Sequence, residues 1–517
     1  MVKHIIDNEI LNKFKNELKN DKIFNVIENA VQKNGIEDVI FSTKNSFLVQ
    51  DVFNNEIEDL PIMTNQKKSG RCWMFSGLSI LSLEIKKKLK IKELELSESY
   101  LMFYDKLEKC NTIFEYVIKN INEPYDSRLF RYILSLSGEN DGNCWHSFLK
   151  LIKKYGICPK DVMGETYDSS NSDKMNQIIS NIVTRNIYIM KNSNHSQDEL
   201  YRIKENALKD VYKILSLCIG EPVKEFTFDY EMSKDKDKDK DKDKDKDKEN
   251  KNDIINSNDS DKSCTVDAID NNNNIGINIS SKYLSICENC FFDSESEDNE
   301  KKNGSKSDEK EFNSIKITPL EFLKKYSNND FDDYIQLCNY PGGKYELMKC
   351  YANELNISII DDSSINYKLL NVDINVMKSA IIKSIKNNIP VWFACDVTMD
   401  SSRYDGYLST EVIETSNILG IEIDYDKTAK IELCNTEANH AMVFVGVHLD
   451  DNGKPIRWKI QNSWGEDVGK KGYFIMTDSW FTKYVYECSV NKKFVTEDII
   501  EAYKSDPIIL KPWDCVA

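Results

Sequence analysis

The chain has 517 residues, of which 40% are hydrophobic and 30% are charged, so it can bury a large core and form more than one lobe. Its net charge of −17 argues against a nucleic-acid partner, because such binders carry a basic surface. No apolar run is long enough to cross a bilayer, so no membrane contact is expected. The 14 cysteines are scattered through ordinary globular sequence, which indicates a reducing, cytoplasmic location rather than a disulfide framework.

The first part of the chain is mainly helical in pattern. Residues 1–56 predict an N-terminal helical arm, whose opening stretch has amphipathic spacing and lacks an apolar core of signal-peptide length. Residues 57–231 predict a helical lobe with a helical insertion. Within it, side chains at helical spacing predict a core-facing stripe: Tyr100, Phe103, Tyr104 and Leu107. A further helix is expected from Trp145 to a stop at Gly156.

Residues 232–314 differ sharply in composition. They open with a strict Lys-Asp alternation at 234–247 and continue with Asn-, Ser- and acid-rich sequence. So little apolar surface cannot offset the entropy lost on ordering, which predicts a disordered insert. Cys287 and Cys290 form one CxxC without a second pair, and this is a weak signal for zinc. We therefore expect no metal and no cofactor.

Residues 315–517 predict the remainder of the helical insertion and a β-rich lobe, which makes the fold class α+β. Four strands are expected: 389–397, 441–449, 456–464 and 472–478. The third alternates with period two. One face would carry Ile456, Trp458, Ile460 and Asn462, and the other Arg457, Lys459 and Gln461. This pattern places the amide of Asn462 on the inward face.

Cys72 is a candidate nucleophile. The segment SGRC places it in the first turn of a helix, where the pKa of a thiol falls. Only five histidines are available as a partner: His4, His146, His195, His440 and His448. We favour His440, because it lies at a loop-to-strand junction where a side chain is both rigid and accessible to a cleft. Its imidazole would pair with the thiolate and later protonate the leaving amine.

Three further side chains complete this hypothesis. Asn462 would orient the imidazole by hydrogen bonding to its other ring nitrogen. Gln66 would donate a side-chain N–H to the developing oxyanion, beside the backbone N–H of Cys72. Trp464 would cover the Asn–His bond and exclude water from it. Each residue alone indicates little, since an unpaired cysteine is more often a buried hydrophobe, but the set in this order predicts nucleophilic catalysis.

Three segments resemble the bleomycin hydrolase branch of the papain-like cysteine peptidases. The family pattern NQKxSGRCW matches residues 65–73, HAM matches 440–442 and NSWGEDxGxKGY matches 462–473. Further similarity covers nearly the whole chain apart from the Lys-Asp insert. The separation between Cys72 and His440 far exceeds the roughly 130–150 residues of compact papain-like enzymes, which favours this branch.

The resemblance implies a papain-like two-lobe fold, with a helical lobe, an antiparallel β-barrel-like lobe and a large helical insertion. It implies a cysteine aminopeptidase that acts through a thioester on peptides with a free N-terminus. It also implies a homohexameric ring whose active sites face an inner channel. The implied roles are nucleophile for Cys72, acid/base for His440, orienting residue for Asn462, oxyanion donor for Gln66 and active-site packing for Trp73 and Trp464.

One departure from the family lies in the subsite that pairs with the substrate backbone. The family pattern NDGGQW reads NDGNCW here, so that Gly142 is kept and Asn143 replaces the second glycine. Asparagine is the residue after glycine that best adopts left-handed geometry, so we expect Gly142 and Asn143 still to bind substrate. The Asn143 side chain should nevertheless crowd the cleft and alter the preference beside the scissile bond.

The second departure is the C-terminal tail, whose carboxylate at Ala517 should bind the substrate N-terminus by resemblance. The tail reads WDCVA and is about three residues shorter than the usual form, a loss of about 10 Å of reach. An alternative is therefore an oligopeptidase or endopeptidase with relaxed aminopeptidase restriction. Two further rivals are a non-catalytic scaffold and a nucleic-acid-binding relative of the family, which the filled catalytic positions and the negative charge disfavour.

Overall fold

The computed structural model describes residues 5–137, 141–232, 311–327, 331–355 and 367–514. With the exception of Glu311, these residues belong to one unit made of residues 1–233 and 312–517. Most of the predicted disordered insert, its CxxC pair and Ala517 lie outside the described ranges; only residue 232 and residues 311–314 of the insert are described.

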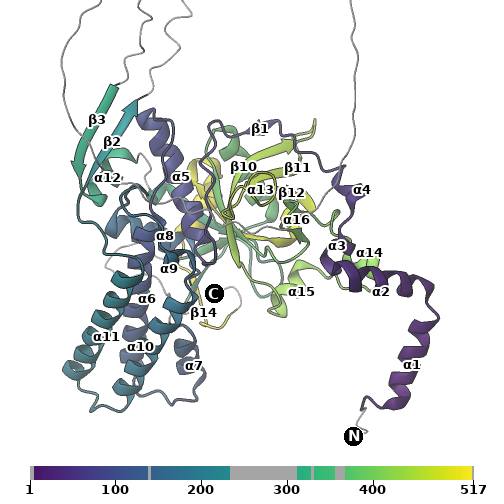
Figure 1. Ribbon diagram of the computed structural model, residues 1–517, viewed down its shortest axis with the longest axis horizontal. Coiled ribbons are helices and arrows are strands. Elements are labelled where there is room, and N and C mark those ends of the chain that lie inside the picture. The colour runs from purple at the N-terminus through teal and green to yellow at the C-terminus, as the bar shows by residue number, and fades with distance from the viewer. Residues whose placement is uncertain (1–4, 138–140, 233–310, 328–330, 356–366, 515–517) are drawn as a thin grey trace, which may run out of the picture. The chain divides into compact units, whose positions relative to one another are not determined.

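Helices make up most of the described chain before residue 233 (Figure 1). They are α1 (Asn8–Lys19), α2 (Lys22–Asn34), α3 (Ile36–Ile40), α4 (Thr43–Ser46), α5 (Cys72–Leu89), α6 (Glu98–Lys119), α7 (Arg128–Ser135), α8 (Trp145–Tyr155), α9 (Tyr167–Ser170), α10 (Asp173–Lys191) and α11 (Gln197–Cys218). Six more follow among the strands: α12 (Pro319–Tyr326), α13 (Ile374–Lys386), α14 (Thr415–Leu419), α15 (Lys427–Glu432), α16 (Asp478–Tyr484) and α17 (Glu497–Lys504).

The expected helices form for local reasons that the structure makes plain. Helix α6 begins where Ser97 caps the backbone N–H of Tyr100 at 3.0 Å, and it buries Tyr100 and Phe103 as predicted. Helix α8 begins at Trp145 and ends at Gly156, which confirms both predicted limits. Helices α6, α10 and α11 pack alongside one another (Figure 1). Stripes of buried side chains at helical spacing, such as Ile179 and Val183 of α10, hold them together.

The strands of the described chain form one large mixed sheet and one separate pair. The large sheet has the order β14-β5-β6-β4-β13-β7-β10-β11-β12-β9-β8, with β1 beside β10. Its members are β1 (Asn55–Glu56), β4 (Tyr334–Cys338), β5 (Cys350–Asn353), β6 (Leu369–Asn371), β7 (Val391–Cys395), β8 (Ser401–Ser402), β9 (Tyr407–Leu408), β10 (His440–Leu449), β11 (Pro455–Gln461), β12 (Tyr473–Thr477), β13 (Val485–Asn491) and β14 (Ile508–Leu510). Helices and a mixed sheet are thus both present, as the α+β class requires, and the four expected strands appear as β7, β10, β11 and β12.

The separate pair consists of β2 (Phe226–Met232) and β3 (Glu311–Ile317), which hydrogen-bond to each other. These strands contain residue 232 and residues 311–314, which the composition assigns to the disordered insert. At these two edges the predicted disorder is wrong, because backbone pairing between the flanking segments orders them. The stretch between the two strands lies outside the described residues.

Strand β11 shows both the success and the limit of the period-two prediction. Trp458, Ile460 and Asn462 are buried as expected, whereas Ile456 is 45% exposed near the start of the strand. Gln461, assigned to the opposite face, is also buried, because its side chain bonds Ser79 of α5. Both faces of the sheet are covered near Gln461, so alternation no longer separates buried from exposed positions.

Helix α5 is buried along most of its length and packs on strand β10. Ser76 donates a hydrogen bond to the carbonyl of Ala441 at 3.1 Å, and Ser79 donates one to the Gln461 side chain at 3.0 Å. The indole N–H of Trp392 on β7 donates to the carbonyl of Trp73 at 3.2 Å. These bonds set the position of the first turn of α5 relative to the first residue of β10.

A testable consequence concerns the turn after α8. Gly156 has φ 77° and ψ −162°, and a Cβ atom there would lie 2.2 Å from the backbone of Pro319. Gly156→Ala should therefore reduce the free energy of unfolding by the backbone strain of about 1–3 kcal/mol plus a further overpacking term of about 1–3 kcal/mol. Denaturant unfolding followed by tryptophan fluorescence measures this loss.

The matched control is Gly35→Ala. Gly35 has a similar conformation, φ 87° and ψ 159°, but a Cβ atom there meets nothing within 4 Å. Gly35→Ala should therefore show only the strain term. An equal loss in the two variants would mean that the close approach of Pro319 does not constrain the fold.

Candidate active site

Cys72 is the first residue of helix α5, as predicted, and its thiol lies against the start of β10. The backbone N–H of Ala441 donates to Cys72 Sγ at 3.4 Å, so the sulfur lies next to the residue that follows His440. Burial raises the pKa of the thiol, and the hydrogen bond from Ala441 offsets part of that rise. The thiol is thus the resting form unless a neighbouring positive charge stabilises the thiolate.

His440 and Asn462 are joined as the sequence predicts. The Nε2 atom of His440 lies 2.9 Å from Oδ1 of Asn462, and that oxygen also accepts the backbone N–H of Ser463 at 2.8 Å. Because the oxygen is held as an acceptor, Nε2 is the donor. In the neutral ring the lone pair is then on Nδ1, which is the atom that can take up a proton.

The environment of His440 keeps its ring neutral. Burial lowers the pKa of His440, the bond to Asn462 opposes this, and the charge of Arg403 lowers the pKa further, to about 4. The indole of Trp464 stacks on the imidazole with centroids 4.7 Å apart and planes 27° from parallel. Arg403 in turn lies 4.6 Å from the centroid of the Trp464 ring. The predicted cover of the Asn–His bond by Trp464 is therefore present as a stack on the imidazole.

Gln66 lies on the turn before α5 and is buried. Its Nε2 donates to the carbonyl of Ser69 at 2.6 Å, and its Oε1 accepts the hydroxyl of Ser463 at 2.6 Å. The backbone N–H of Gln66 donates to the carbonyl of Ser463 at 2.8 Å. These bonds fix which end of the amide is the donor and leave its second hydrogen for another acceptor. They also tie the turn to the strand end that carries Asn462.

Gly142 and Asn143 lie just before α8, close to the turn that carries Cys72. The indole N–H of Trp73 donates to the carbonyl of the preceding residue, Asp141, at 2.9 Å, which agrees with a packing role for Trp73. Asn143 does not use the left-handed geometry that asparagine tolerates, since it is not among the residues with positive φ. Its side chain instead bonds Asp105 at 3.1 Å and the backbone N–H of Cys144 at 3.0 Å.

The base of the C-terminal tail is held by side chains of two other segments. Lys344 and Tyr345 each donate to a carboxylate oxygen of Asp514 at 2.6 Å. Arg128 at the start of α7 lies 4.2 Å from the centroid of the Trp513 ring. The residues after Asp514, with Ala517, lie outside the described chain.

The described residues offer no cluster of three or more metal-ligating side chains. Among their helices, none is long and apolar enough to span a bilayer. Of the remaining histidines in the described part, His195 is exposed and bonds the Lys191 carbonyl, while His146 is buried in α8.

Sequence reasoning missed two groups that surround the site. Arg403, which contacts Trp464, lies in a turn near β8 that carries no motif. Arg71 and Glu165 form an ion pair beneath the turn of Cys72, although 94 residues separate them. For the ion pair, the sequence showed only that an arginine directly precedes Cys72. Whether such an arginine is buried cannot be predicted until its partner, here Glu165, is known.

The thiol of Cys72 at the start of α5 lies against Ala441, and the preceding residue, His440, bonds Asn462 and stacks on Trp464. Together with the helix-on-sheet fold, this arrangement defines a papain-like cysteine peptidase. Cys72, His440 and Gln66 lie around the same turn and strand end.

The chain belongs to the Peptidase C1-like family, whose sequence profile matches residues 5–290 and 302–517. It is 30% identical to Aminopeptidase C of Listeria innocua, covering 95% of this chain and 93% of the relative. It is 31% identical to Aminopeptidase C of Lactobacillus helveticus, covering 98% and 97%. The crystal structure of pepw from Lactobacillus rhamnosis matches with a TM-score of 0.81 at 29% identity, covering 99% and 98%. The family resemblance read from the motifs is thereby confirmed.

The pH dependence of the thiol gives a test of the Arg403 contact. Removing a nearby positive charge stabilises every protonated form, so Arg403→Gln should raise the pKa values of the Cys72–His440 pair. The alkylation rate of Cys72 by iodoacetamide should then rise at a higher pH than in the parent. The rate is followed by mass spectrometry of the Cys72 peptide.

Arg202→Gln is the control, because Arg202 is an exposed arginine that pairs with Glu199 on α11. Its alkylation profile should match that of the parent chain. An Arg403→Gln profile that is unshifted, or shifted to lower pH, would show that Arg403 does not set the electrostatics of His440.

Proposed function

We propose that this cysteine peptidase is an aminopeptidase whose reaction is carried by Cys72, His440 and Asn462. The Cys72 sulfur attacks the carbonyl carbon of the scissile amide, and its proton passes to Nδ1 of His440. The tetrahedral intermediate collapses, the amine leaves with that proton, and a thioester remains. Water then attacks the thioester with His440 as base, which releases the carboxylic acid and restores the thiol.

The observation that carries this proposal is the bond from His440 Nε2 to Asn462 Oδ1 at 2.9 Å. It leaves Nδ1 as the proton acceptor on a neutral ring. Because the pKa of His440 is lowered to about 4, that acceptor stays available at and above neutral pH. Trp464 shields the bond from water, which would otherwise compete for the amide oxygen.

Gln66 is proposed as the oxyanion donor together with the backbone N–H of Cys72. One hydrogen of the Gln66 amide is used by the Ser69 carbonyl, and the other is left for the oxygen of the tetrahedral intermediate. The fixed amide matters, because a donor that has to reorient during the reaction stabilises the transition state less.

We assign substrate binding to Gly142, Asn143 and Ala517, and packing around the site to Trp73 and Trp464. The Peptidase C1-like relatives named Aminopeptidase C support removal of residues from a free N-terminus. The short tail supports a second candidate, a peptidase that removes longer N-terminal steps or cleaves internally. The Asn143 side chain, held by Asp105, supports an altered preference beside the scissile bond.

Location, lobes and assembly complete the proposal. The cysteines of the described residues are all free, which supports a cytoplasmic enzyme. The papain-like fold supports two lobes that meet at the Cys72–His440 site, with the segment boundaries at residues 57, 232 and 315 taken from the sequence.

We propose a homohexameric ring. Helices α1 and α2 support it, because neither contains a buried residue and both expose large apolar side chains.

The proposed activity is tested with fluorogenic aminoacyl amides whose N-terminus is either free or acylated. Hydrolysis of the free-amine substrates alone would identify an aminopeptidase. Digestion of a longer peptide, followed by mass spectrometry, separates the two candidates: stepwise loss of single residues supports strict trimming, and larger fragments support the relaxed peptidase. The rate should fall below about pH 4, where His440 becomes protonated.

Cys72→Ala is the control in both assays, since it removes the nucleophile and leaves the fold. Its activity should drop by several orders of magnitude, as expected when a covalent nucleophile is lost. Undiminished hydrolysis by Cys72→Ala would overturn the mechanism.

The proposed assembly is tested by two substitutions on the exposed face of α2. Ile23 and Val26 are 72% and 70% exposed, so Ile23→Asp with Val26→Asp should leave the single chain folded and weaken an interface. Light scattering after size exclusion should show the parent as a six-chain species and the variant as a smaller one. Asn29→Asp adds one negative charge to the polar face of α2, against two in the variant, and should remain hexameric. A parent that runs as a single chain would contradict the assembly.

A further inference from the structure

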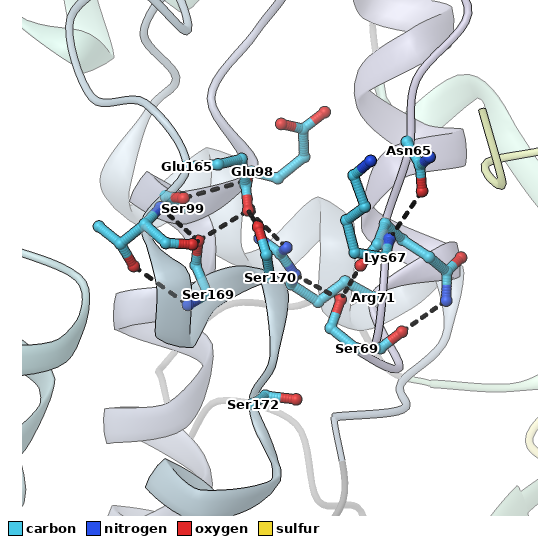
Figure 2. Close-up of polar contacts among 12 residues, drawn as sticks. Asn65, Lys67, Ser69, Arg71, Glu98, Ser99, Glu165, Ser169, Ser170 and Ser172 are labelled. Carbon is cyan, nitrogen blue, oxygen red and sulfur yellow. Dashed lines mark hydrogen bonds and ion pairs between the residues drawn. The ribbon is translucent and has the colours of Figure 1, made fainter. Parts of the chain in front are cut away.

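The turn that carries Gln66 and Cys72 rests on a buried ion pair outside the catalytic set. Arg71 is 1% exposed, and its two Nη atoms donate to the two oxygens of Glu165 at 3.0 and 2.7 Å. This is a bidentate pair, which fixes the plane of the guanidinium as well as its position. Figure 2 shows Arg71 and Glu165 facing each other among the surrounding serines.

The carboxylate of Glu165 is satisfied by hydroxyl groups in addition to the arginine. Ser99 donates to Oε1 at 3.0 Å, and Ser169 and Ser170 donate to Oε2 at 2.7 and 3.3 Å (Figure 2). Burial raises the pKa of Glu165, but the bond to Arg71 and its charge outweigh this and lower the pKa to about 2. The carboxylate of Glu165 therefore stays charged throughout the pH range in which a peptidase works.

The ion pair connects to Gln66 through Ser69. The Nε atom of Arg71 donates to the hydroxyl of Ser69 at 3.0 Å, and that hydroxyl donates to the carbonyl of Gln66 at 2.7 Å. The carbonyl of Ser69 in turn accepts the Gln66 side chain. Hydrogen bonds thus link the Arg71 guanidinium through Ser69 to the Gln66 amide, which is proposed as the oxyanion donor. The residue after Arg71 is Cys72, the proposed nucleophile.

A second buried carboxylate holds the other side of the same turn. Asp141 accepts the backbone N–H of Gly70 at 3.0 Å and pairs with Lys106 of α6. The backbone of Lys68 also bonds the chain beyond Glu165, through the Ser170 carbonyl at 2.9 Å and the Ser172 N–H at 3.3 Å. Residues 66–72 are thus anchored from two directions by the helical part of the chain.

We propose that Arg71 and Glu165 are positioning residues of the peptidase reaction, acting by holding the Gln66 amide and the Cys72 thiol toward one substrate carbonyl. This inference rests on the proposed function of Cys72 and Gln66. Neither Arg71 nor Glu165 touches the reacting atoms. Their contribution is geometric, because the guanidinium is neutralised by the carboxylate and leaves little net charge beside the thiol.

The test compares Glu165→Ala with a matched ion pair elsewhere. Misplacing catalytic groups by about 1 Å costs roughly 100-fold, so Glu165→Ala should lower kcat by about 10- to 100-fold and leave KM within about twofold. It also leaves the charge of Arg71 unneutralised next to Cys72, so the alkylation profile of the thiol should move to lower pH. A slower enzyme with a more acidic thiol is a combination that general loss of stability does not produce.

The control is Asp478→Ala. Asp478 pairs with Lys378 at 2.7 Å, and its side chain is 20% exposed against 19% for Glu165, but the pair joins α13 to α16. It should lower stability and leave kcat and the alkylation profile unchanged. Glu165→Gln keeps an oxygen for the arginine and should give an intermediate kcat, which a purely structural role does not require.

Ser69→Ala covers the case in which Glu165→Ala does not fold. It leaves the ion pair intact and removes only the link from Arg71 to Gln66, and kcat should fall about 3- to 10-fold, as expected for one neutral hydrogen bond. A folded Glu165→Ala or Ser69→Ala with the kcat of Asp478→Ala overturns the positioning role. A parent enzyme that hydrolyses no amide overturns the proposed function, and the positioning role with it, so the two failures are distinguishable.

Discussion

The docking of helix α5 on strand β10 is the contact on which the rest of the site depends. The first twelve residues of the helix, 72–83, are all buried, so its apolar side chains face neighbours on every side rather than along one stripe. Such a helix has no preferred rotation from hydrophobic burial alone. The hydroxyls of Ser76 and Ser79 fix the rotation of α5 about its axis, because each is buried and each hydrogen-bonds a partner on β10 or β11. Cys72 and Ala441 meet as a result.

The same burial that fixes the geometry also sets the charge state of the site. Desolvation raises the pKa of Cys72 and lowers that of His440, so each group alone prefers to be neutral. A thiolate and an imidazolium can exist here only together, each offsetting the desolvation of the other. The positive charge of Arg403 lowers the pKa of His440 further and so favours the neutral imidazole. The same packing therefore both covers the site and sets the protonation of Cys72 and His440.

Much of this arrangement could be predicted from the sequence, because short local patterns indicate where the helices and strands that carry the site residues begin. The helix start at Cys72, the strand start at His440 and the inward amide of Asn462 follow from turn residues and period-two alternation. The partners of the turn could not be predicted in this way. Glu165 and Asp141 come from distant segments, and nothing local distinguishes a buried carboxylate from a solvated one. The partner of the Asn143 side chain could not be predicted for a related reason, since Asp105 lies on another helix.

The helical part of the chain is for this reason more than an insertion beside a catalytic core. Glu165 holds Arg71, and Asp141 holds Gly70 and, through its carbonyl, the indole of Trp73. Asp141 is buried and Glu165 is mostly shielded from water, and charged groups in such places are costly unless their bonds are made. Two such carboxylates bond the turn formed by residues 66–72. Their bonds leave this turn few alternative conformations. On the proposed mechanism, these carboxylates hold Gln66 and Cys72 in one geometry through Gly70 and Arg71.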